Sequence, residues 1–557
     1  FQAEDGIRDV ERSRGLGDVY KRQDICNYNA IAVVKGKVLF FNELCHACGG
    51  CSYICPEGAM TEHPVSIGRV ETADAKGEFA FGHGLLNVGE ALAPKVVQAV
   101  KKHIRPNEIT LIDASPGAAC PVVEAVAGAD VAVLVTEPTP FGLNDLKLAV
   151  GLSLKVGVPA AIVVNRSDGV DELIQRYSDE IGVPIIGRIP FRRSYAETYS
   201  RGERLVDRHP ELTSILMNIY RRACEAALGP PQPVPKEQRK LPVAQEPREA
   251  SHGGGGRFTE ITVISGKGGT GKTTITASLA ALLEDKVLSD CDVDAADLHL
   301  LLHPEVKEVA DFLGGYKALI DEEACTACGR CAEFCHFDAI APVVEEDAAE
   351  PQSYRVNQFT CEGCGVCGYL CPVDAIAVEK AITGQSYVSD TPFGPLSHAR
   401  LGIAEENSGK LVTRVRNIAA DLAATHSAGA ILGDGSPGTG CPVIASVSGV
   451  DAALIVTEPT VSGVHDLERV LQLTRHFQVQ ALVCINKCDL NAEQAERIRA
   501  LALKHGATML GDVPFDAEVN DCLMKGEVLV ERGAGPAAQA VRALADGLRR
   551  HVSGEGA

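Results

Sequence analysis

A glycine-rich loop between a short apolar run and a helical pattern constrains the fold of this chain more than any other segment. The run Glu-Ile-Thr-Val-Ile stands at 260–264, and the loop Gly-Lys-Gly-Gly-Thr-Gly-Lys-Thr-Thr follows at 266–274. Residues 275–283 then carry apolar side chains at helical spacing. In such a unit the glycines let the backbone approach phosphate groups, which the helix N-terminus attracts. The order predicts a doubly wound α/β fold with a mostly parallel sheet.

Two side chains of this loop indicate a nucleoside triphosphate rather than an ordinary glycine turn. Lys272 is expected to reach the β- and γ-phosphates, and the Thr273 hydroxyl is expected to ligate Mg²⁺. A glycine turn would not need this Lys-Thr pair. The sequence therefore predicts a site for ATP and Mg²⁺. Its expected binding residues are Gly266, Gly268, Gly269, Thr270, Gly271, Lys272, Thr273 and Thr274.

Cysteines form a second pattern, with twenty in a chain that shows no export signal. In such a chain they are expected to be reduced thiols that bind metal, in a cytoplasmic setting. Two runs have the spacing C-x₂-C-x₂-C-x₃-C, and a third run with one cysteine ahead of it stands near the start. The members are Cys325, Cys328, Cys331, Cys335; Cys361, Cys364, Cys367, Cys371; and Cys26, Cys45, Cys48, Cys51, Cys55.

Residues 321–379 resemble a bacterial two-cluster ferredoxin, in which the fourth cysteine of each run crosses to the other [4Fe–4S] cluster. The resemblance implies one cluster on Cys325, Cys328, Cys331 and Cys371, and another on Cys361, Cys364, Cys367 and Cys335. A further cluster could be held by Cys26, Cys45, Cys48 and Cys51, which leaves Cys55 without partners. His336 stands where that family usually has proline. Zinc is the rival metal, although eight cysteines at this double spacing favour clusters.

The chain also repeats itself. Leu-Ile-Asp-Ala-Ser-Pro-Gly at 111–117 resembles Leu-Gly-Asp-Gly-Ser-Pro-Gly at 432–438, and Thr-Glu-Pro-Thr occurs at both 136–139 and 457–460. Both pairs are offset by 321 positions. The repeat predicts two tandem copies of one unit, of which the first lacks its glycine loop. Such copies could form an intramolecular pseudo-dimer, or the chain could form a homodimer.

The repeat suggests a division of the chain. Residues 17–23 resemble translated sequencing-adapter DNA, so residues 1–23 are expected to be an artefact, with a disordered natural tail as the alternative. The artefact implies that the first copy is truncated and that Asp24 is not a natural start. The remaining segments are a partial ferredoxin insert at 24–65, a truncated ATPase copy at 66–228, a linker at 229–256, a complete ATPase copy at 257–320 and 380–557, and a ferredoxin insert at 321–379.

Lys267, near the start of the loop, resembles the second lysine of the MinD/ParA family of P-loop ATPases. The resemblance implies that Lys267 acts on the nucleotide of a facing subunit. It also implies that Asp290 lies near Mg²⁺, that Asp292 orients the attacking water and that Asp434 holds Mg²⁺ through water. The adenine contacts implied by the family are Asn486 and Pro514. The predicted catalytic residues are Lys267, Lys272, Asp292 and Asp434.

Cys120 and Cys441 each lie seven residues after an aspartate of the repeat. The related nitrogenase iron protein has a cluster-ligating cysteine at that spacing. It also needs a second cysteine per subunit, and none lies between Lys380 and Gly429. Two interpretations stay open, a bridging cluster and a small buried thiol, and the missing partner favours the thiol.

The net charge of −21 argues against nucleic acid as a partner, and no apolar run is long enough for membrane insertion. The expected reaction is hydrolysis of ATP to ADP and phosphate, slow without a partner. The favoured function couples ATP to electron transfer through [4Fe–4S] clusters to a redox partner. One alternative is a cluster carrier or scaffold for acceptor apoproteins. Another is a positioning ATPase of the MinD/ParA type.

Overall fold

The computed structural model describes most of the chain. The segments 5–23 of the expected adapter stretch and 230–256 of the expected linker lie outside the described residues. The described residues are 2–4, 26–28, 30–34, 37–41, 45–55, 59–75, 79–87, 90, 92–167, 169, 171–229, 258–344, 350–405 and 407–552.

The chain divides into two compact units. One contains residues 1–112, 312–384 and 404–407, and the other contains 113–311, 385–403 and 408–557. Residues 66–112 therefore belong with the cysteine-rich segments, whereas the sequence analysis grouped 66–228 together. The local reason is a long hairpin, β4 (Ser66–Ala75) with β5 (Phe79–Leu86), on which helix α3 (Ala93–Lys101) packs.

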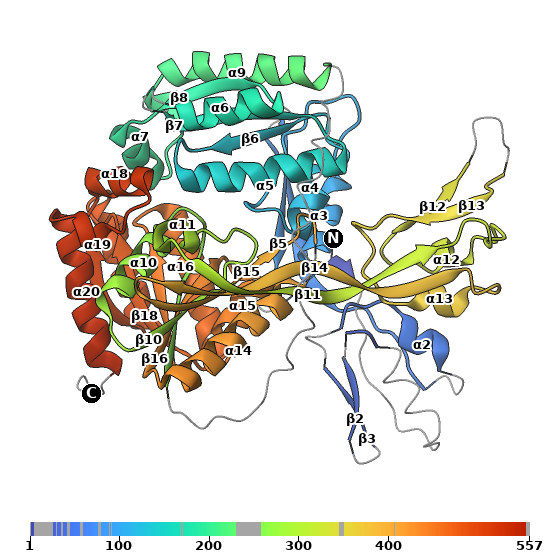
Figure 1. The fold of residues 1–557 in the computed structure, drawn as a ribbon. Helices are drawn as coiled ribbons and strands as arrows, with labels where there is room; N and C mark the ends of the chain where they lie inside the picture. Colours follow the sequence, from blue (N-terminus) through green and yellow to red (C-terminus); the bar gives the residue numbers. More distant parts are fainter. Residues whose placement is uncertain are drawn as a thin grey trace. The chain divides into compact units, whose positions relative to one another are not determined.

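The second unit contains most of a nine-stranded sheet (Figure 1). Its order is β11, β14, β15, β10, β16, β9, β17, β18, β19, and the strands from β15 to β19 pair in parallel. The sheet confirms the predicted α/β class with a mostly parallel sheet. The bounds in that order are Glu305–Ile320, Ile376–Thr391, Gly394–Leu401, Lys286–Asp290, Ala430–Pro437, Thr259–Ser265, Ala452–Thr457, Gln480–Asn486 and Thr508–Val513.

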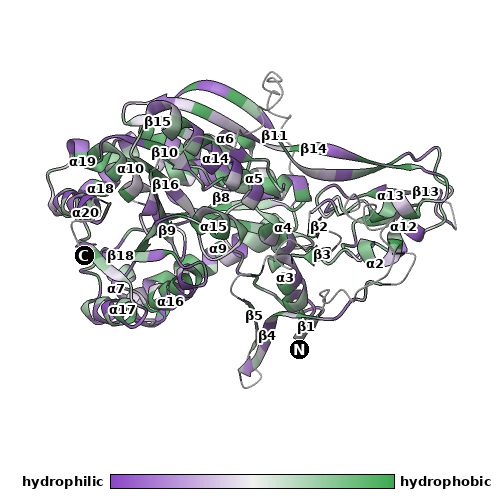
Figure 2. Cartoon of the chain, turned by 90° about the horizontal axis from the view of Figure 1, so that it is seen from below, coloured by the Kyte–Doolittle hydropathy of each residue, from purple (hydrophilic) through white to green (hydrophobic). Residues whose placement is uncertain are grey.

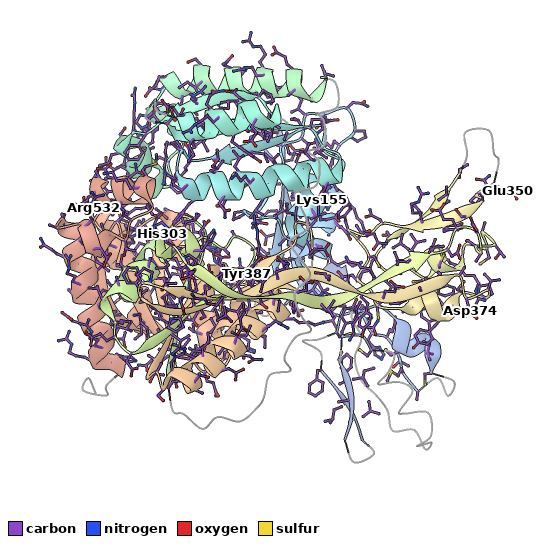
Figure 3. The ribbon with its side chains drawn as sticks, in the orientation of Figure 1. Lys155, His303, Glu350, Asp374, Tyr387 and Arg532 are labelled. Atoms are coloured by element: carbon purple, nitrogen blue, oxygen red, sulfur yellow. The ribbon has the colours of Figure 1, made fainter. Side chains whose placement is uncertain are left out.

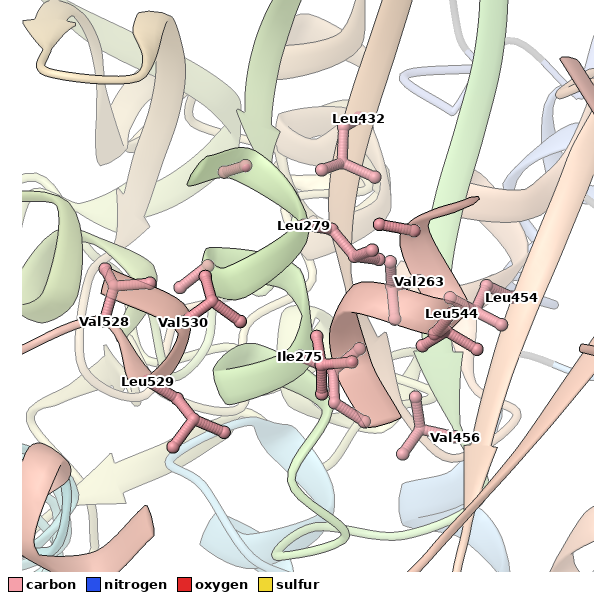
Figure 4. Close-up of a cluster of buried hydrophobic side chains, with 14 of the residues drawn as sticks. Val263, Ile275, Leu279, Leu432, Leu454, Val456, Val528, Leu529, Val530 and Leu544 are labelled. Atoms are coloured by element: carbon pink, nitrogen blue, oxygen red, sulfur yellow. The ribbon is translucent and has the colours of Figure 1, made fainter. Parts of the chain in front are cut away.

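Buried apolar side chains lie on both faces of this sheet, as a central parallel sheet requires. On one face, Ile275 and Leu279 of α10 pack against Val263 of β9 and Leu432 of β16 (Figure 4). The last helix, α20, buries its apolar side in this core. The helices are α10 (Lys272–Leu282), α11 (Leu298–Leu302), α14 (Ser408–His426), α15 (Cys441–Val447), α16 (Val461–His476), α17 (Ala492–Lys504), α18 (Ala517–Lys525), α19 (Leu529–Arg532) and α20 (Pro536–Val552).

The same unit holds a smaller parallel sheet in the order β6, β7, β8. Its core contains Leu146 and Val150 of α5 with Ile162 and Val164 of β7. The strands are β6 (Ala132–Thr136), β7 (Ala160–Ser167) and β8 (Ile185–Pro190), and the helices are α4 (Cys120–Val126), α5 (Pro140–Val156), α6 (Glu172–Ile181), α7 (Arg193–Ser200), α8 (Leu205–Arg208) and α9 (Glu211–Ala227).

The other unit consists of short elements around the cysteine runs. Gln2–Glu4 forms strand β1, which pairs antiparallel with β4, so three residues of the expected adapter stretch form an element that the sequence did not predict. The remaining elements are β2 (Ile31–Val34), β3 (Lys37–Phe40), α2 (Gly50–Ile54), α12 (Arg330–Glu333), β12 (Ile340–Val343), β13 (Ser353–Val356) and α13 (Val366–Leu370).

Hydropathy is mixed along the helices, and α16, α17 and α20 carry both hydrophilic and hydrophobic stretches (Figure 2). Such helices bury one side against a sheet and expose the other. Among the described residues, no helix has the length and apolar character needed to span a bilayer.

Candidate functional site: a phosphate loop and three cysteine loops

The glycine loop joins β9 to α10, as the sequence predicts. Gly269 and Gly271 have φ angles of 77° and 89°, in the left-handed region that favours glycine. A Cβ atom on Gly271 would lie 2.4 Å from the side-chain nitrogen of Asn486. Helix α10 begins at Lys272, so its N-terminal amides face the loop. The backbone therefore has the form of a phosphate cradle.

Four predicted residues meet at the ends of β10 and β16. The Lys272 ammonium lies 2.9 Å from an Asp434 carboxylate oxygen and 3.4 Å from one of Asp292. The Thr273 hydroxyl donates to Asp434 over 2.8 Å. Because β10 and β16 are parallel neighbours, Asp290 and Asp434 lie side by side in register. The structure thus brings the loop lysine, the loop hydroxyl and the acidic strand ends together.

Three buried polar atoms at or near this loop make no hydrogen bond in the described structure. They are Thr270 Oγ1, Asp290 Oδ2 and Asp294 Oδ1. Leaving a polar atom buried without a partner costs about 1–3 kcal/mol, so such atoms usually have a ligand, ion or water. Carboxylate and hydroxyl oxygens suit Mg²⁺, and a hydroxyl with free amides suits phosphate. The residues present therefore fit ATP with Mg²⁺.

Burial and charge change the acidity of this site. Burial raises the pKa of Asp292 to about 6, although the Lys272 ammonium opposes the shift. Burial also raises the pKa of Asp290, and repulsion from Asp434 and Asp292 adds to the effect. Burial disfavours the charge of Lys272, but the attraction of Asp434 and Asp292 outweighs it and raises the lysine pKa. The lysine therefore stays cationic, as a phosphate ligand must.

The early lysine, Lys267, occupies a different environment from Lys272. Its ammonium is within 3.1 Å of the Ser462 hydroxyl, 3.9 Å from a Glu458 carboxylate oxygen and 5.4 Å from the centre of the Tyr199 ring. Tyr199 belongs to α7, which precedes the linker, whereas Ser462 follows it. Lys267 therefore lies beside residues that are far apart in the sequence, before and after residues 230–256.

The two residues predicted to contact adenine differ in what the structure shows. The Asn486 amide donates to the Thr270 carbonyl over 2.7 Å and so connects the glycine loop to the end of β18. Pro514 follows β19 and is half-buried. The next residue after Asn486, Lys487, contacts the Gly269 carbonyl over 3.4 Å and forms an ion pair with Glu458. Lys487 is not among the predicted residues, although its place beside Asn486 at the end of β18 was a usable signal.

Helix α5 brings two further residues that the sequence did not predict. Asn144 donates to an Asp297 carboxylate oxygen over 2.9 Å, on the loop that follows the acidic strand end. Burial raises the pKa of Asp145 to about 7, and the neighbouring Asp292 and Glu137 add to the shift. At its other end, Lys155 donates to the Ile403 carbonyl over 3.2 Å (Figure 3). No sequence spacing relates α5 to these partners.

The first predicted cluster set lines a single cavity. Cys325, Cys328 and Cys331 come from one loop and Cys371 from another, and all four face the cavity together with Tyr354 and Ile376. Amide N–H groups point at two of the sulfurs, from Ala327 to Cys325 over 3.4 Å and from Ala375 to Cys371 over 3.2 Å. Hydrogen bonds to sulfur are typical of cluster ligands.

The other two sets also gather, although less completely. Cys335, Cys361 and Cys367 share one packed cluster with Ala339 and Val356. Burial raises the pKa of Cys51 to about 12, and the nearby sulfurs of Cys48, Cys45 and Cys26 add to it. Among the described residues, no three His, Cys, Asp or Glu side chains converge on one metal ion. The sulfurs of a cubane bind four separate irons, so they need not converge in this way.

All three cysteine loops have the same backbone. The residues two and four positions after the first cysteine are left-handed in each loop, with φ angles of 51° and 73°, 53° and 76°, and 63° and 80°. The pairs are Ala47 and Gly49, Ala327 and Gly329, and Gly363 and Gly365. Two alanines in this strained region indicate that the loop shape itself is required. The donor set and loop shape therefore fit [4Fe–4S] clusters.

Cys120 and Cys441 occupy matching positions, each as the first residue of a short helix, α4 or α15. Both are half-buried. The structure favours neither the bridging cluster nor the thiol interpretation. Cys484 on β18 is fully buried among core side chains.

The family described as the CobQ/CobB/MinD/ParA nucleotide binding domain matches residues 261–530. The uncharacterized protein MJ0578 of Methanocaldococcus jannaschii is 33% identical over 301 residues, 53% of this chain and 99% of that protein. MJ0579 of the same organism is 32% identical over 194 residues, 34% of this chain and 65% of that protein.

More distant likenesses are also found. The iron-sulfur cluster carrier protein of Pyrococcus abyssi is 23% identical over 312 residues, which cover 52% of this chain and 85% of that protein. The solved MinD cell division protein of Aquifex aeolicus is 24% identical, with a TM-score of 0.31, over 52% of this chain and 96% of the other.

Proposed function

Because the chain belongs to the CobQ/CobB/MinD/ParA nucleotide-binding family, we propose that it hydrolyses ATP at the loop of 266–274 and couples this reaction to electron transfer through [4Fe–4S] clusters. The observation that carries the cluster half is the cavity lined by Cys325, Cys328, Cys331 and Cys371. These four cysteines come from two separate loops, as two-cluster ferredoxins require.

The nucleotide half rests on the side chains at the phosphate loop. Lys272 and the α10 amides would bind the β- and γ-phosphates, and Thr273 with Asp434 would hold Mg²⁺. Asp292, 3.4 Å from Lys272, would orient the attacking water in its ionised form. Lys267, which lies beside Tyr199, would act on the γ-phosphate of a nucleotide held by a facing subunit. Its partial exposure beside residues of the other repeat supports slow hydrolysis until the two repeats close together.

The cysteines would act as thiolate ligands for clusters that supply one-electron redox chemistry. The amide donors at Cys325 and Cys371 would stabilise thiolate charge on the ligands. We assign one cluster to Cys325, Cys328, Cys331 and Cys371, and a second to Cys335, Cys361, Cys364 and Cys367. Cys26, Cys45, Cys48 and Cys51 would hold a third, and Cys55 stays outside these sets.

We also propose that 66–228 and 257–557 are tandem copies. Matching helix starts support this. Thr139 caps α5 by accepting from the Gly142 amide over 3.0 Å, and Thr460 caps α16 by accepting from the Gly463 amide over 2.9 Å. Both threonines close a Thr-Glu-Pro-Thr sequence. Threonine is a favoured N-cap because its oxygen satisfies a free helical amide.

The test is anaerobic iron and sulfide analysis with electron paramagnetic resonance (EPR) spectroscopy of the reduced full chain. Cys371→Ser should lower iron by about four atoms per chain, whereas Cys224→Ser on the exposed face of α9 should not. The reduction potential of the clusters should shift when Mg-ATP binds. Equal iron in both variants contradicts the ligand assignment. Identical potentials and identical cluster retention with and without Mg-ATP contradict the coupling.

A cluster carrier for apoproteins is the second candidate, because a relative carries the name iron-sulfur cluster carrier protein. The two functions differ in how firmly the clusters are held. A carrier should lose iron to an apoprotein or a chelator when ATP binds. An electron carrier should keep its iron and be reduced and reoxidised repeatedly. Ligands that come from two separate loops favour firmly held clusters, and therefore the electron carrier.

A further inference from the structure

The loop of Cys45–Cys51 and the loop of Cys361–Cys367 contact each other within one unit, and the contacts come in matching pairs. Residues 45–55 correspond to 361–371 with an offset of 316, and 26–31 correspond to 335–340 with an offset of 309. In this correspondence Asn27 matches His336, and Ala47 matches Gly363. The contacts between the segments can therefore be compared one by one.

The first pair of contacts joins side chains to carbonyl oxygens. The Asn27 amide donates to the Gly363 carbonyl over 2.8 Å. In the matching contact, His336 Nδ1 lies 3.1 Å from the Ala47 carbonyl and can donate to it. Each segment thus uses the residue after its crossing cysteine to bind the other segment's cysteine loop.

The second pair involves glycines. A Cβ atom on Gly365 would lie 3.4 Å from the Asn27 side chain, and one on Gly49 would lie 3.0 Å from the His336 ring. Gly49 and Gly365 also correspond at an offset of 316. His46 and Glu362, again a corresponding pair, contact each other, with His46 Nδ1 3.1 Å from a Glu362 carboxylate oxygen. A residue that contacts its own counterpart lies on the axis of a twofold arrangement.

Additional contacts strengthen the junction on one side. The Tyr28 hydroxyl donates to the Glu362 carbonyl over 2.6 Å, and the Tyr28 ring stacks on His46 with centroids 3.9 Å apart. His46 Nδ1 lies 3.1 Å from a Glu362 carboxylate oxygen. Lys95 also donates to the His336 carbonyl over 2.9 Å. The contact of His46 with Glu362 joins a corresponding pair, whereas Phe337 stands where the other segment has Tyr28 and has no hydroxyl to donate. The symmetry is therefore approximate.

We propose that residues 26–28 and 45–51, together with residues 335–336 and 361–367, form a pseudo-twofold junction, with His46 and Glu362 facing each other at its axis. The junction itself needs no metal. Its consequence rests on the proposed function, because Cys48 and Cys364 each belong to a proposed cluster set. The two sets are then direct neighbours, and an electron lost by one cluster can be gained by the other without a further carrier.

The first test measures amide hydrogen exchange in the full chain, with or without iron. His336→Ala should raise exchange in 45–50 by about tenfold, and Asn27→Ala should do the same in 361–366, because each removes a donor to a carbonyl of that loop. His336→Asn should behave as the unaltered chain, since it supplies the amide that the other segment uses. The control is Asn218→Ala with His426→Ala, two exposed sites of the same residue types.

The second test is EPR spectroscopy of the reduced, iron-loaded chain. The spectrum should show lines broadened by spin coupling between neighbouring clusters. The double variant Asn27→Ala with His336→Ala should have narrower lines, because the coupling is weaker, while its iron content stays constant. Unchanged exchange in both single variants overturns the junction. An uncoupled spectrum in the iron-loaded, unaltered chain overturns the neighbouring clusters. If the variants show the expected exchange effects but the chain binds no iron, the junction is supported and the proposed function is contradicted.

Discussion

Strands β6 and β17 have closely matching sequences and very different surroundings. Each strand ends at the first threonine of a Thr-Glu-Pro-Thr sequence, and the two sequences are offset by 321 positions. Strand β17 lies between β9 and β18, and all six of its residues are buried. Among the described strands β6 pairs with β7 alone, and its Val135 is 62% exposed whereas the corresponding Val456 is fully buried. Burial of a strand is thus decided by its neighbours more than by its own pattern.

Two aspartates at corresponding positions also differ in burial. Asp434 is fully buried on β16, between β10 and β9, and it contacts the side chains of Lys272, Thr273 and Thr276. Its counterpart Asp113 is exposed, in a described segment that forms no strand. A carboxylate in the same local sequence becomes part of a site only where a glycine loop and its helix pack beside it.

The largest expected effect comes from removing the lysine of the glycine loop, which only the second of the two compared regions contains among the described residues. Lys272→Ala should abolish ATP binding, because the α10 loop is the one phosphate loop in the described part of the chain. Isothermal titration should give about one nucleotide per chain for the unaltered protein and none for the variant. Lys155→Ala on α5 serves as the control. Residual binding near full stoichiometry would mean that another segment also holds nucleotide.

A second comparison changes the two aspartates in parallel. Asp434→Asn should lower the rate of phosphate release at least about 100-fold, because it removes charge from the proposed Mg²⁺ site and from beside Lys272. Asp113→Asn should leave the rate within about twofold, as expected for an exposed position. Equal losses in both variants would show that the exposed aspartate also serves a site.

The acidity of the buried site offers a third measurement. Because burial raises the pKa of Asp292 to about 6, kcat/KM for ATP should fall about tenfold per pH unit below that value, as the carboxylate becomes protonated. Asp292→Asn should be slow throughout and lack this inflection. The pH range to measure is about one unit either side of 6. If kcat/KM of the unaltered chain is constant across that range, Asp292 does not orient the attacking water.

The raised pKa of Asp292 also affects folding stability, which should fall as pH rises, whereas activity should rise. A folded-state pKa above the unfolded value means that the folded chain keeps a proton which the unfolded chain releases. The nucleotide-free protein should therefore lose stability as pH rises from about 4 to about 6. Mg-ATP should oppose this loss, since it binds the ionised carboxylates. Thermal unfolding across this range, with and without Mg-ATP, measures both effects.

The smallest expected effect concerns packing. Val456→Ala should lower the free energy of unfolding by about 2 kcal/mol, because it leaves a void between β9 and β18. Val135→Ala should change it by less than about 0.5 kcal/mol. Denaturant unfolding of the two variants side by side checks the difference. A similar cost for both would mean that β6 is covered in solution.

Much of this arrangement could be predicted from short-range patterns. The loop of 266–274 and the apolar runs around it predicted the parallel sheet, and the cysteine spacing predicted which sulfurs would line one cavity. The contributions of Asn144 and Asp145 could not be predicted, because they depend on where α5 packs. Neither could the contacts of Asn27 and His336, since hydrogen bonds to carbonyl groups leave no signature in residue spacing.

The hydrogen bond from Asn486 to the Thr270 carbonyl has a consequence for thermodynamics. It ties the loop to the end of β18, a strand whose core residues are fully buried. The loop is therefore preorganised, and the entropy of ordering it has already been lost during folding. Calorimetry of ATP binding should accordingly show a small heat-capacity change, and Asn486→Ala should make that change more negative.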